Sequence, residues 1–119
     1  MQIQLNTSNG IENKDTLDRW ADTEIRQLFS RFAADVTRIE IHLSDENHAA
    51  GGAGDKRCVM EARLVHLQPM AVTHDADNID DAFRGAAEKL KRALDSAIGR
   101  MNSHRDRQSI RKDDGAVVE

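Results

Sequence analysis

The chain has 119 residues, a formal net charge of −4 and one cysteine. A chain of this length forms one domain with a modest core. A single thiol cannot form an internal disulfide, which excludes a disulfide-stapled secreted scaffold and indicates a reducing compartment. The first residues, MQIQLNTS, lack the basic and apolar regions of a signal peptide, and no apolar run approaches the roughly 20 residues that span a bilayer. We therefore expect a cytoplasmic protein with no membrane partner.

The first part of the chain predicts a strand, a helix and a second strand. Residues 2–6 and 36–43 alternate apolar with polar side chains, as strands with one buried face do. In residues 14–34 the polar side chains of Arg19 and Arg26 fall on one side of a helix. The apolar side chains fall on its other side and are Leu17, Trp20, Ala21, Ile25, Leu28, Phe29 and Phe32.

The middle of the chain predicts a hairpin loop and two further strands. Residues 44–55 are polar and then glycine-rich, which is typical of a hairpin loop. They lack the Lys-Ser/Thr ending of a phosphate-binding loop, and no helix follows them. Residues 57–67 and 70–75 predict strands separated by a turn at Pro69. The side chains expected to face the core are Cys58, Met60, Ala62, Leu64, Met70 and Val72.

The longest regular pattern covers residues 79–104 and predicts an amphipathic helix. Asn78 is a suitable N-cap, and Asp80 and Asp81 place negative charge in the first turn, where the helix dipole favours it. The apolar stripe consists of Ile79, Ala82, Phe83, Ala86, Leu90, Leu94, Ala97, Ile98 and Met101.

Cations flank this stripe. Lys89, Arg92 and Arg100 fall on one strip beside it. Arg84 and Lys91 flank its other edge. Residues 84–112 contain nine Lys or Arg and three acids, a balance of +6, while the rest of the chain carries −10. Charge alone leaves two interpretations open, a solvated helix face with a basic tail or a surface for an anionic partner.

The order of elements, β-α-β-β-β-α, predicts the fold class. A strand–helix–strand unit has a right-handed crossover and parallel strands, and the later hairpin-length connections give antiparallel neighbours. Because each strand has one apolar face, both helices must cover the same side of the sheet. We therefore expect an α+β two-layer sandwich with a mixed four-stranded sheet. Residues 1–104 would form this domain, and residues 105–119, which have no apolar period, a flexible C-terminal tail.

The polar residues give little support to an enzyme or a metal site. Three histidines and Cys58 lie on or near the expected strands, but they lack zinc-ligand spacing and strand parity does not place them on one face. Cys58 has no histidine or aspartate at a recognised spacing, so it is interpreted as a small core residue. Helix capping and the helix dipole explain the acidic cluster before the last helix better than a divalent cation does. We expect no enzymatic activity, cofactor, metal or small-molecule substrate.

Four segments together resemble the family of ribosome hibernation-promoting factors and ribosome-associated inhibitors. They are the opening MQIQLNTSNG, the end of the first helix at QLFSRF, the three-strand meander, and DNIDDAFRGAAEKLKRAL. The last segment matches a family pattern of an Asp-led cap, an Ala-apolar pair and Lys-Leu-x-Arg-x-Leu. The resemblance covers residues 1–104 and is to the short form of the family, because the chain is too short for the additional dimerisation domain of the long forms.

The resemblance implies a fold like that of a double-stranded-RNA-binding domain. It also implies binding to small-subunit rRNA in the channel used by tRNA and mRNA, which would block translation in resting or stressed bacterial cells. The match carries over Lys89, Arg92 and Arg100 as contacts to the rRNA backbone. The further cations that we expect at the rRNA surface are Lys91, Arg84, Arg26 and Arg19. The chain departs from the family where Asp80 replaces a frequent Tyr, and where the first helix has few Lys. The alternative is a non-ribosomal protein-interaction module of the same fold.

Overall fold

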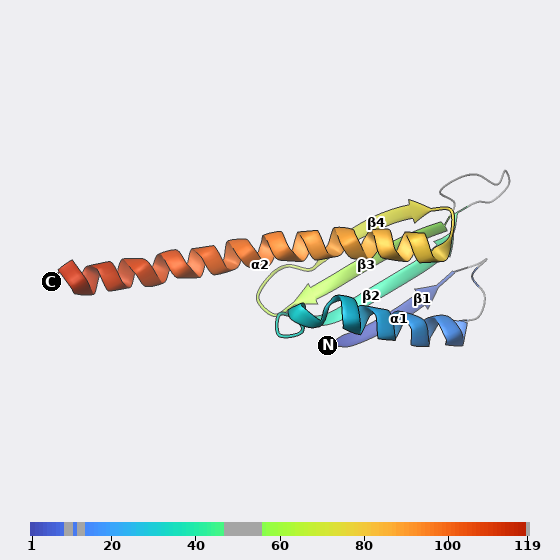
Figure 1. Cartoon of the computed structure of the whole chain (residues 1–119), viewed down its shortest axis with the longest axis horizontal. Coiled ribbons are helices and arrows are strands. Elements are labelled where there is room, and N and C mark those ends of the chain that lie inside the picture. The colour runs from blue at the N-terminus through green and yellow to red at the C-terminus, as the bar shows by residue number, and fades with distance from the viewer. Residues whose placement is uncertain (9–10, 12–13, 47–55, 119) are drawn as a thin grey trace.

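The computed structural model of the chain (Figure 1) describes residues 1–8, 11, 14–46 and 56–118, with side chains up to Ser103. Its elements are β1 (Gln2–Thr7), α1 (Lys14–Leu28), the short 3₁₀ helix η1 (Ser30–Phe32), β2 (Val36–Asp45), β3 (Lys56–Leu64), β4 (Met70–Ala76) and α2 (Ile79–Val118). The expected hairpin loop lies mostly outside the described residues.

The four strands form one mixed sheet in the order β1-β2-β3-β4. β1 is parallel to β2, while β2, β3 and β4 are antiparallel neighbours. The register aligns Ile39 with Ile3 on one side and with Ala62 on the other, so inward-facing residues form rows across the sheet. The predicted topology is therefore confirmed.

Both helices cover the same face of this sheet, as Figure 1 shows. The core lies between the two layers, because the alternate residues of β2 and β3 point toward the helices. The rings of Trp20 on α1 and Phe83 on α2 join the helices, with centroids 4.5 Å apart. The largest fully buried side chains include Phe29, Phe83, Ile25, Ile39, Ile41, Met60, Leu90 and Leu94. The predicted α+β two-layer sandwich is confirmed.

Two predicted element ends were wrong. The first helix ends at Leu28 rather than at residue 34, and a 3₁₀ turn follows it. Because i and i+3 lie on the same side of a 3₁₀ turn, Phe29 and Phe32 both become buried, with ring centroids 6.0 Å apart. The third strand ends at Leu64 rather than at residue 67, since its partner β2 begins at Val36, the residue paired with Leu64.

The last helix begins as predicted but continues further. The backbone N–H of Asp81 donates to Oδ1 of Asn78 at 2.8 Å, so Asn78 is the N-cap. The helical backbone runs to Val118, where the sequence analysis expects a tail without regular structure. Residues 105–118 contain no proline, and several of them are good helix formers, so helical backbone can continue where the apolar stripe has ended. The division into a domain of residues 1–104 and a tail stays a prediction.

Candidate nucleic-acid interface

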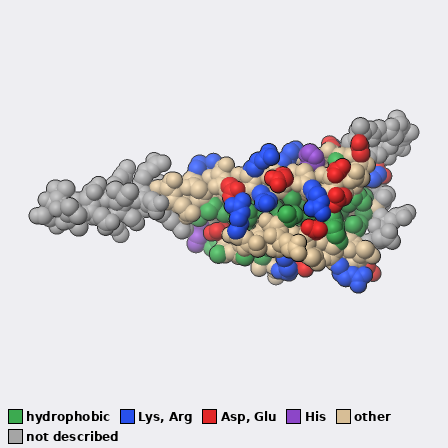
Figure 2. Space-filling view, in the orientation of Figure 1, with side chains coloured by type: hydrophobic (Ala, Val, Ile, Leu, Met, Phe, Trp, Pro, Cys, Tyr) green, Lys and Arg blue, Asp and Glu red, His purple; other side chains and the backbone are tan. Residues whose placement is uncertain are grey.

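The seven cations that the sequence suggests as rRNA contacts do not form one continuous patch. Their positions follow from the contacts of the two helices. Lys89 lies on the side of α2 toward β4, and helical spacing puts Arg100 on the same strip and Arg92 beside it, nearer to solvent. Arg84 and Lys91 lie on the side of α2 toward α1, and Arg19 and Arg26 lie on α1 itself. In Figure 2, Lys and Arg side chains spread over this face of the molecule with Asp and Glu side chains between them. Each group therefore has its own electrostatic surroundings.

Lys89 ties α2 to the edge of the sheet. Its Nζ donates a hydrogen bond of 2.8 Å to the backbone carbonyl oxygen of Thr73 on β4, the last strand of the sheet. A cation beside an edge strand also discourages pairing with another chain. The ammonium group has three donors, so this bond leaves capacity for a further acceptor.

Arg92 and Arg100, like Lys89, are exposed cations of this strip. Neither side chain makes a hydrogen bond or an ion pair with any residue that the structure describes. Both are held by a helix that packs on the sheet through the fully buried Leu90 and Leu94. At a rise of about 1.5 Å per residue, the strip from Lys89 to Arg100 is roughly 16 Å long.

Arg84 and Lys91 line a small pocket between the two helices. The pocket has a volume of about 120 Å³, and its lining consists of Leu28, Arg84, Ala87, Glu88 and Lys91. Arg84 is held between Asp80 at 3.0 Å and Glu24 at 3.4 Å. Asp80, the larger influence, and Glu24 raise the pKa of this guanidinium. Lys91 has no hydrogen bond or ion pair among the described residues, so it is the freer cation of this pair.

A second ion pair, between Arg31 of η1 and Asp95 of α2, links two elements of the helical layer and was not predicted from the sequence. Nη1 and Nη2 of Arg31 donate to the two carboxylate oxygens of Asp95 at 2.7 and 2.8 Å. This bidentate bond to Arg31 lowers the pKa of Asp95. The two residues are 64 positions apart, so no local spacing in the sequence could have indicated the contact.

The two cations of α1 differ in their surroundings. Arg19 is exposed and makes no hydrogen bond or ion pair within the described part of the chain. Arg26 bonds Asp22 through Nε at 3.0 Å and reaches the carbonyl oxygen of Met1 through Nη1 at 3.4 Å. Arg26 therefore points to the start of β1, away from α2, and the structure does not bring it to the cations of α2.

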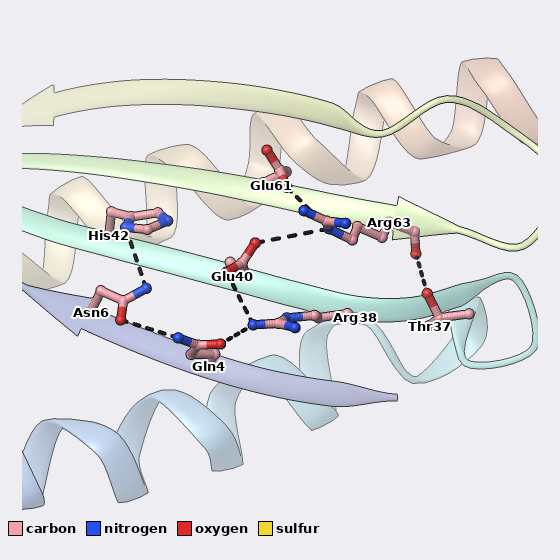
Figure 3. A network of polar contacts seen from close by, with 8 residues as sticks. All are labelled: Gln4, Asn6, Thr37, Arg38, Glu40, His42, Glu61 and Arg63. Carbon is pink, nitrogen blue, oxygen red and sulfur yellow. Dashed lines mark hydrogen bonds and ion pairs between the residues drawn. The ribbon is translucent and has the colours of Figure 1, made fainter.

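The face of the sheet opposite the helices carries a network of polar side chains (Figure 3). Arg38 donates to Gln4 and to Glu40, and Arg63 lies near both Glu40 and Glu61. Further along the sheet, Arg57 donates to Asp75, which lowers the pKa of Asp75. The charges of this face thus largely compensate one another.

Other kinds of site have little support within the described residues. No group of three or more His, Cys, Asp or Glu side chains there could hold a metal ion. Asp75, Asp80 and Asp81 of the acidic cluster bond to Arg57, Arg84 and Asn78. Burial raises the pKa of the Cys58 thiol to about 12, so this thiol is a poor nucleophile.

Comparison with known proteins decides the family. The sequence profile of the family described as sigma 54 modulation protein / S30EA ribosomal protein matches residues 5–102. The chain belongs to this family. Family membership confirms the resemblance drawn from the sequence and supports a ribosome-associated role of the hibernation type. The family's description names no enzymatic activity.

A solved structure shares the fold of this family member. The crystal structure of the N-terminal domain of Protein Y from Thermus thermophilus superimposes with a TM-score of 0.61 at 20% sequence identity. The match covers 79% of this chain and 96% of that one. No curated protein sequence matches the chain significantly. Among the described residues, none of the helices combines the length and the apolarity needed to cross a bilayer.

Proposed function

We propose that this family member binds small-subunit rRNA in the channel used by tRNA and mRNA, and so blocks translation in the cytoplasm of resting or stressed bacterial cells. The observation that carries the proposal is the strip on α2, where Arg92 and Arg100 are exposed and have no partner among the described residues. Such cations are available to phosphates. The proposal includes no catalysis, cofactor or small-molecule substrate.

The geometry of the strip suits a phosphate backbone. Successive phosphates of a nucleic acid strand are several ångströms apart, and the roughly 16 Å between Lys89 and Arg100 corresponds to a short run of them. The guanidinium groups of Arg92 and Arg100 can bind phosphate oxygens in a bidentate way. A-form RNA presents shape and phosphates to such a surface more than readable base edges.

The other cations should contribute to rRNA binding to different extents. Lys91 makes no hydrogen bond or ion pair among the described residues, although it interacts electrostatically with Asp95, and it can join the interface. Arg84 must share its donors with Asp80 and Glu24, so its contribution is smaller. Lys89 retains donors for rRNA although it also holds the edge of β4. Arg19 has no partner in the part of the chain that the structure describes, but it lies on α1, so it contributes only if the rRNA also passes over that helix.

Cosedimentation with purified small subunits at low and high salt tests the proposal. We expect the wild-type protein to sediment with the subunits at low salt and to dissociate as salt rises, because phosphate contacts release counterions. The double variant Arg92→Gln/Arg100→Gln should bind more weakly, with a salt slope reduced by about two. A protein that remains at the top of the gradient at low salt with intact subunits contradicts ribosome binding.

A matched control variant separates the loss of contacts on the α2 strip from the change in the net charge of the protein. Arg57→Gln/Arg63→Gln removes the same number of positive charges from the opposite face of the sheet, where both arginines are paired with acids. This control should bind subunits as the wild type does. Equal losses in the two double variants would show that the strip on α2 is not the interface. Lys89 is left unchanged in both variants because of its bond to Thr73.

A further inference from the structure

A pocket at the free edge of β1 has the composition of an anion site. Its volume is about 460 Å³, and its lining consists of Met1, Gln2, Ile3, Gln4, Arg26 and Arg38. Among the described residues, this lining holds two guanidinium groups and two side-chain amides but no carboxylate, although Asp22 and Glu40 outside it pair with the two arginines. Since β1 is an edge strand and α2 packs on β3 and β4, the pocket is separate from the cations of α2.

The two arginines reach this edge from different elements. Arg26 comes from α1, in the helical layer, and is anchored by Asp22 and by the carbonyl oxygen of Met1. Arg38 comes from β2 and lies on the opposite face of the sheet, beside Gln4 (Figure 3). The edge of β1 thus lies between two guanidinium groups whose positions are set by the fold.

Both guanidinium groups keep unused donors. Arg26 donates through Nε and Nη1, and its Nη2 makes no bond to a described residue. Arg38 uses Nη2 for Gln4 and Glu40, while its Nε is buried and has no hydrogen-bond partner in the described part of the protein. A buried charged donor without a partner is costly, so an acceptor that draws Arg38 into the pocket would offset that cost.

The donors favour phosphate over a carboxylate. The donors without a described partner are Nη2 of Arg26 and Nη1 and Nε of Arg38. They come from two different elements, so an anion with oxygens on several sides suits them better than a planar carboxylate. A phosphate group is tetrahedral and can accept from both guanidinium groups. The pocket volume of about 460 Å³ is many times the roughly 30 Å³ that one water molecule occupies in the liquid. The pocket therefore has space for a phosphate group with an attached sugar or ester.

We propose that the pocket at the β1 edge binds a phosphate group through Arg26 and Arg38. The phosphate belongs either to a small phosphate compound or to the backbone of RNA, and these share the same contacts. The site does not depend on the interface proposed for α2. The assignment of rRNA as the source rests on the proposed function. In that case RNA also contacts the β1 edge of the domain.

Titration of the isolated protein with inorganic phosphate tests the site. The Nε–Hε resonances of the arginines in ¹⁵N NMR spectra should show saturable shifts at Arg26 and Arg38. Arg26→Gln and Arg38→Gln should each weaken phosphate binding about tenfold or more, since each removes a charged donor. Arg63→Gln is the matched control on the same sheet, outside the pocket, and should bind phosphate as the wild type does.

Several results would overturn the site. They are the absence of saturable shifts, equal weakening by Arg63→Gln, or wild-type phosphate affinity in Arg26→Gln/Arg38→Gln. Arg38→Lys keeps the charge but loses the Nε and Nη1 donors of the planar guanidinium, so it should also weaken binding, and it provides a second variant if Arg38→Gln does not fold. Far-UV circular dichroism checks folding of each variant.

Ribosome cosedimentation identifies the source of the phosphate. If rRNA supplies it, Arg26→Gln/Arg38→Gln lowers the salt slope of ribosome binding by about two. If that slope is unchanged while phosphate binding by the isolated protein is lost, a small phosphate compound is the ligand. Failure of ribosome binding altogether would contradict the function proposed for α2, whereas the phosphate titration would still decide the pocket.

Discussion

The imidazole of His74 on β4 occupies the space that a side chain at position 85 of α2 would need. A Cβ added at Gly85 would overlap Cγ, Cδ2 and Nε2 of His74. Gly99, further along the same helix, has no heavy atom within 4 Å of an added Cβ. One glycine therefore allows close packing between α2 and the edge strand, and the other has no such contact.

Alanine at these two glycines should have opposite effects. Gly99→Ala should raise the free energy of unfolding by about 0.5–1 kcal/mol, because alanine is the better helix former. Gly85→Ala gains the same propensity but forces His74 aside, and overpacking costs about 1–3 kcal/mol, so the net effect should be a loss. Urea unfolding measures both. Equal stabilisation by the two substitutions would contradict the packing of His74, and His74→Ala/Gly85→Ala should recover the loss.

The aromatic contact between the helices should be a major source of stability. Phe83 is fully buried, and its ring lies 4.5 Å from that of Trp20. Phe83→Ala should lower the free energy of unfolding by about 3–5 kcal/mol. Fluorescence of Trp20, the only tryptophan of the chain, measures unfolding directly. Val65→Ala is the control, since Val65 is 51% exposed and should change stability by less than about 0.5 kcal/mol.

The ion pair between Arg31 and Asp95 should make the free energy of unfolding depend on pH in the acid range. Arg31 lowers the pKa of Asp95 in the folded protein below its ordinary value of 3.8. The pair therefore stabilises the fold above that value, and the stabilisation is lost as pH falls through the lowered folded pKa. Both side chains are about half exposed, so the effect is modest.

Carboxyl NMR titration from pH 5 downward checks this pair, since it follows Asp95 from above its ordinary pKa of 3.8 into the acid range below it. In Arg31→Gln the pKa of Asp95 should rise toward its ordinary value, while the pKa of Asp75, which is lowered by Arg57, should stay low. An unchanged pKa of Asp95 in this variant would show that Arg31 is not its partner.

The thiol of Cys58 should be unreactive in the folded protein. Its side chain is fully buried in β3, and burial raises its pKa to about 12. At pH 8 almost no thiolate is present, and reagents cannot reach the sulfur, so labelling by a disulfide reagent should require unfolding. The same protein in concentrated urea is the control and should react rapidly. Fast labelling without denaturant would contradict the buried position.

Local periodicity predicted which side chains face the core, because the periods of 2 and 3.6 residues follow from backbone geometry alone. The inward rows of β2 and β3 and the apolar stripe of α2 are where the sequence indicated them. The same reasoning missed the end of α1, where Phe29 and Phe32 lie in a 3₁₀ turn, since a short turn of this kind is stabilised by packing of its two rings.

The surroundings of each cation were not readable from the sequence. Periodicity separated Lys89, Arg92 and Arg100 from Arg84 and Lys91, and the structure keeps these groups on different sides of α2. It could not show that Thr73 accepts a bond from Lys89, because that depends on which strand ends the sheet. Nor could it show that Arg26 and Arg38 line one pocket, since they come from different layers.

The sequence by itself determined the order of elements, the buried face of each and the family resemblance. These depend on residue types at short, regular spacings. Only the tertiary structure decided which cations are paired among the described residues. Asp95 and Thr73, the partners of Arg31 and Lys89, lie 64 and 16 residues away along the chain. Arg84 adds Glu24, 60 residues away, to its local partner Asp80. The strip on α2 is therefore basic by its sequence, and the fold leaves Arg92 and Arg100 on it exposed and without a partner among the described residues.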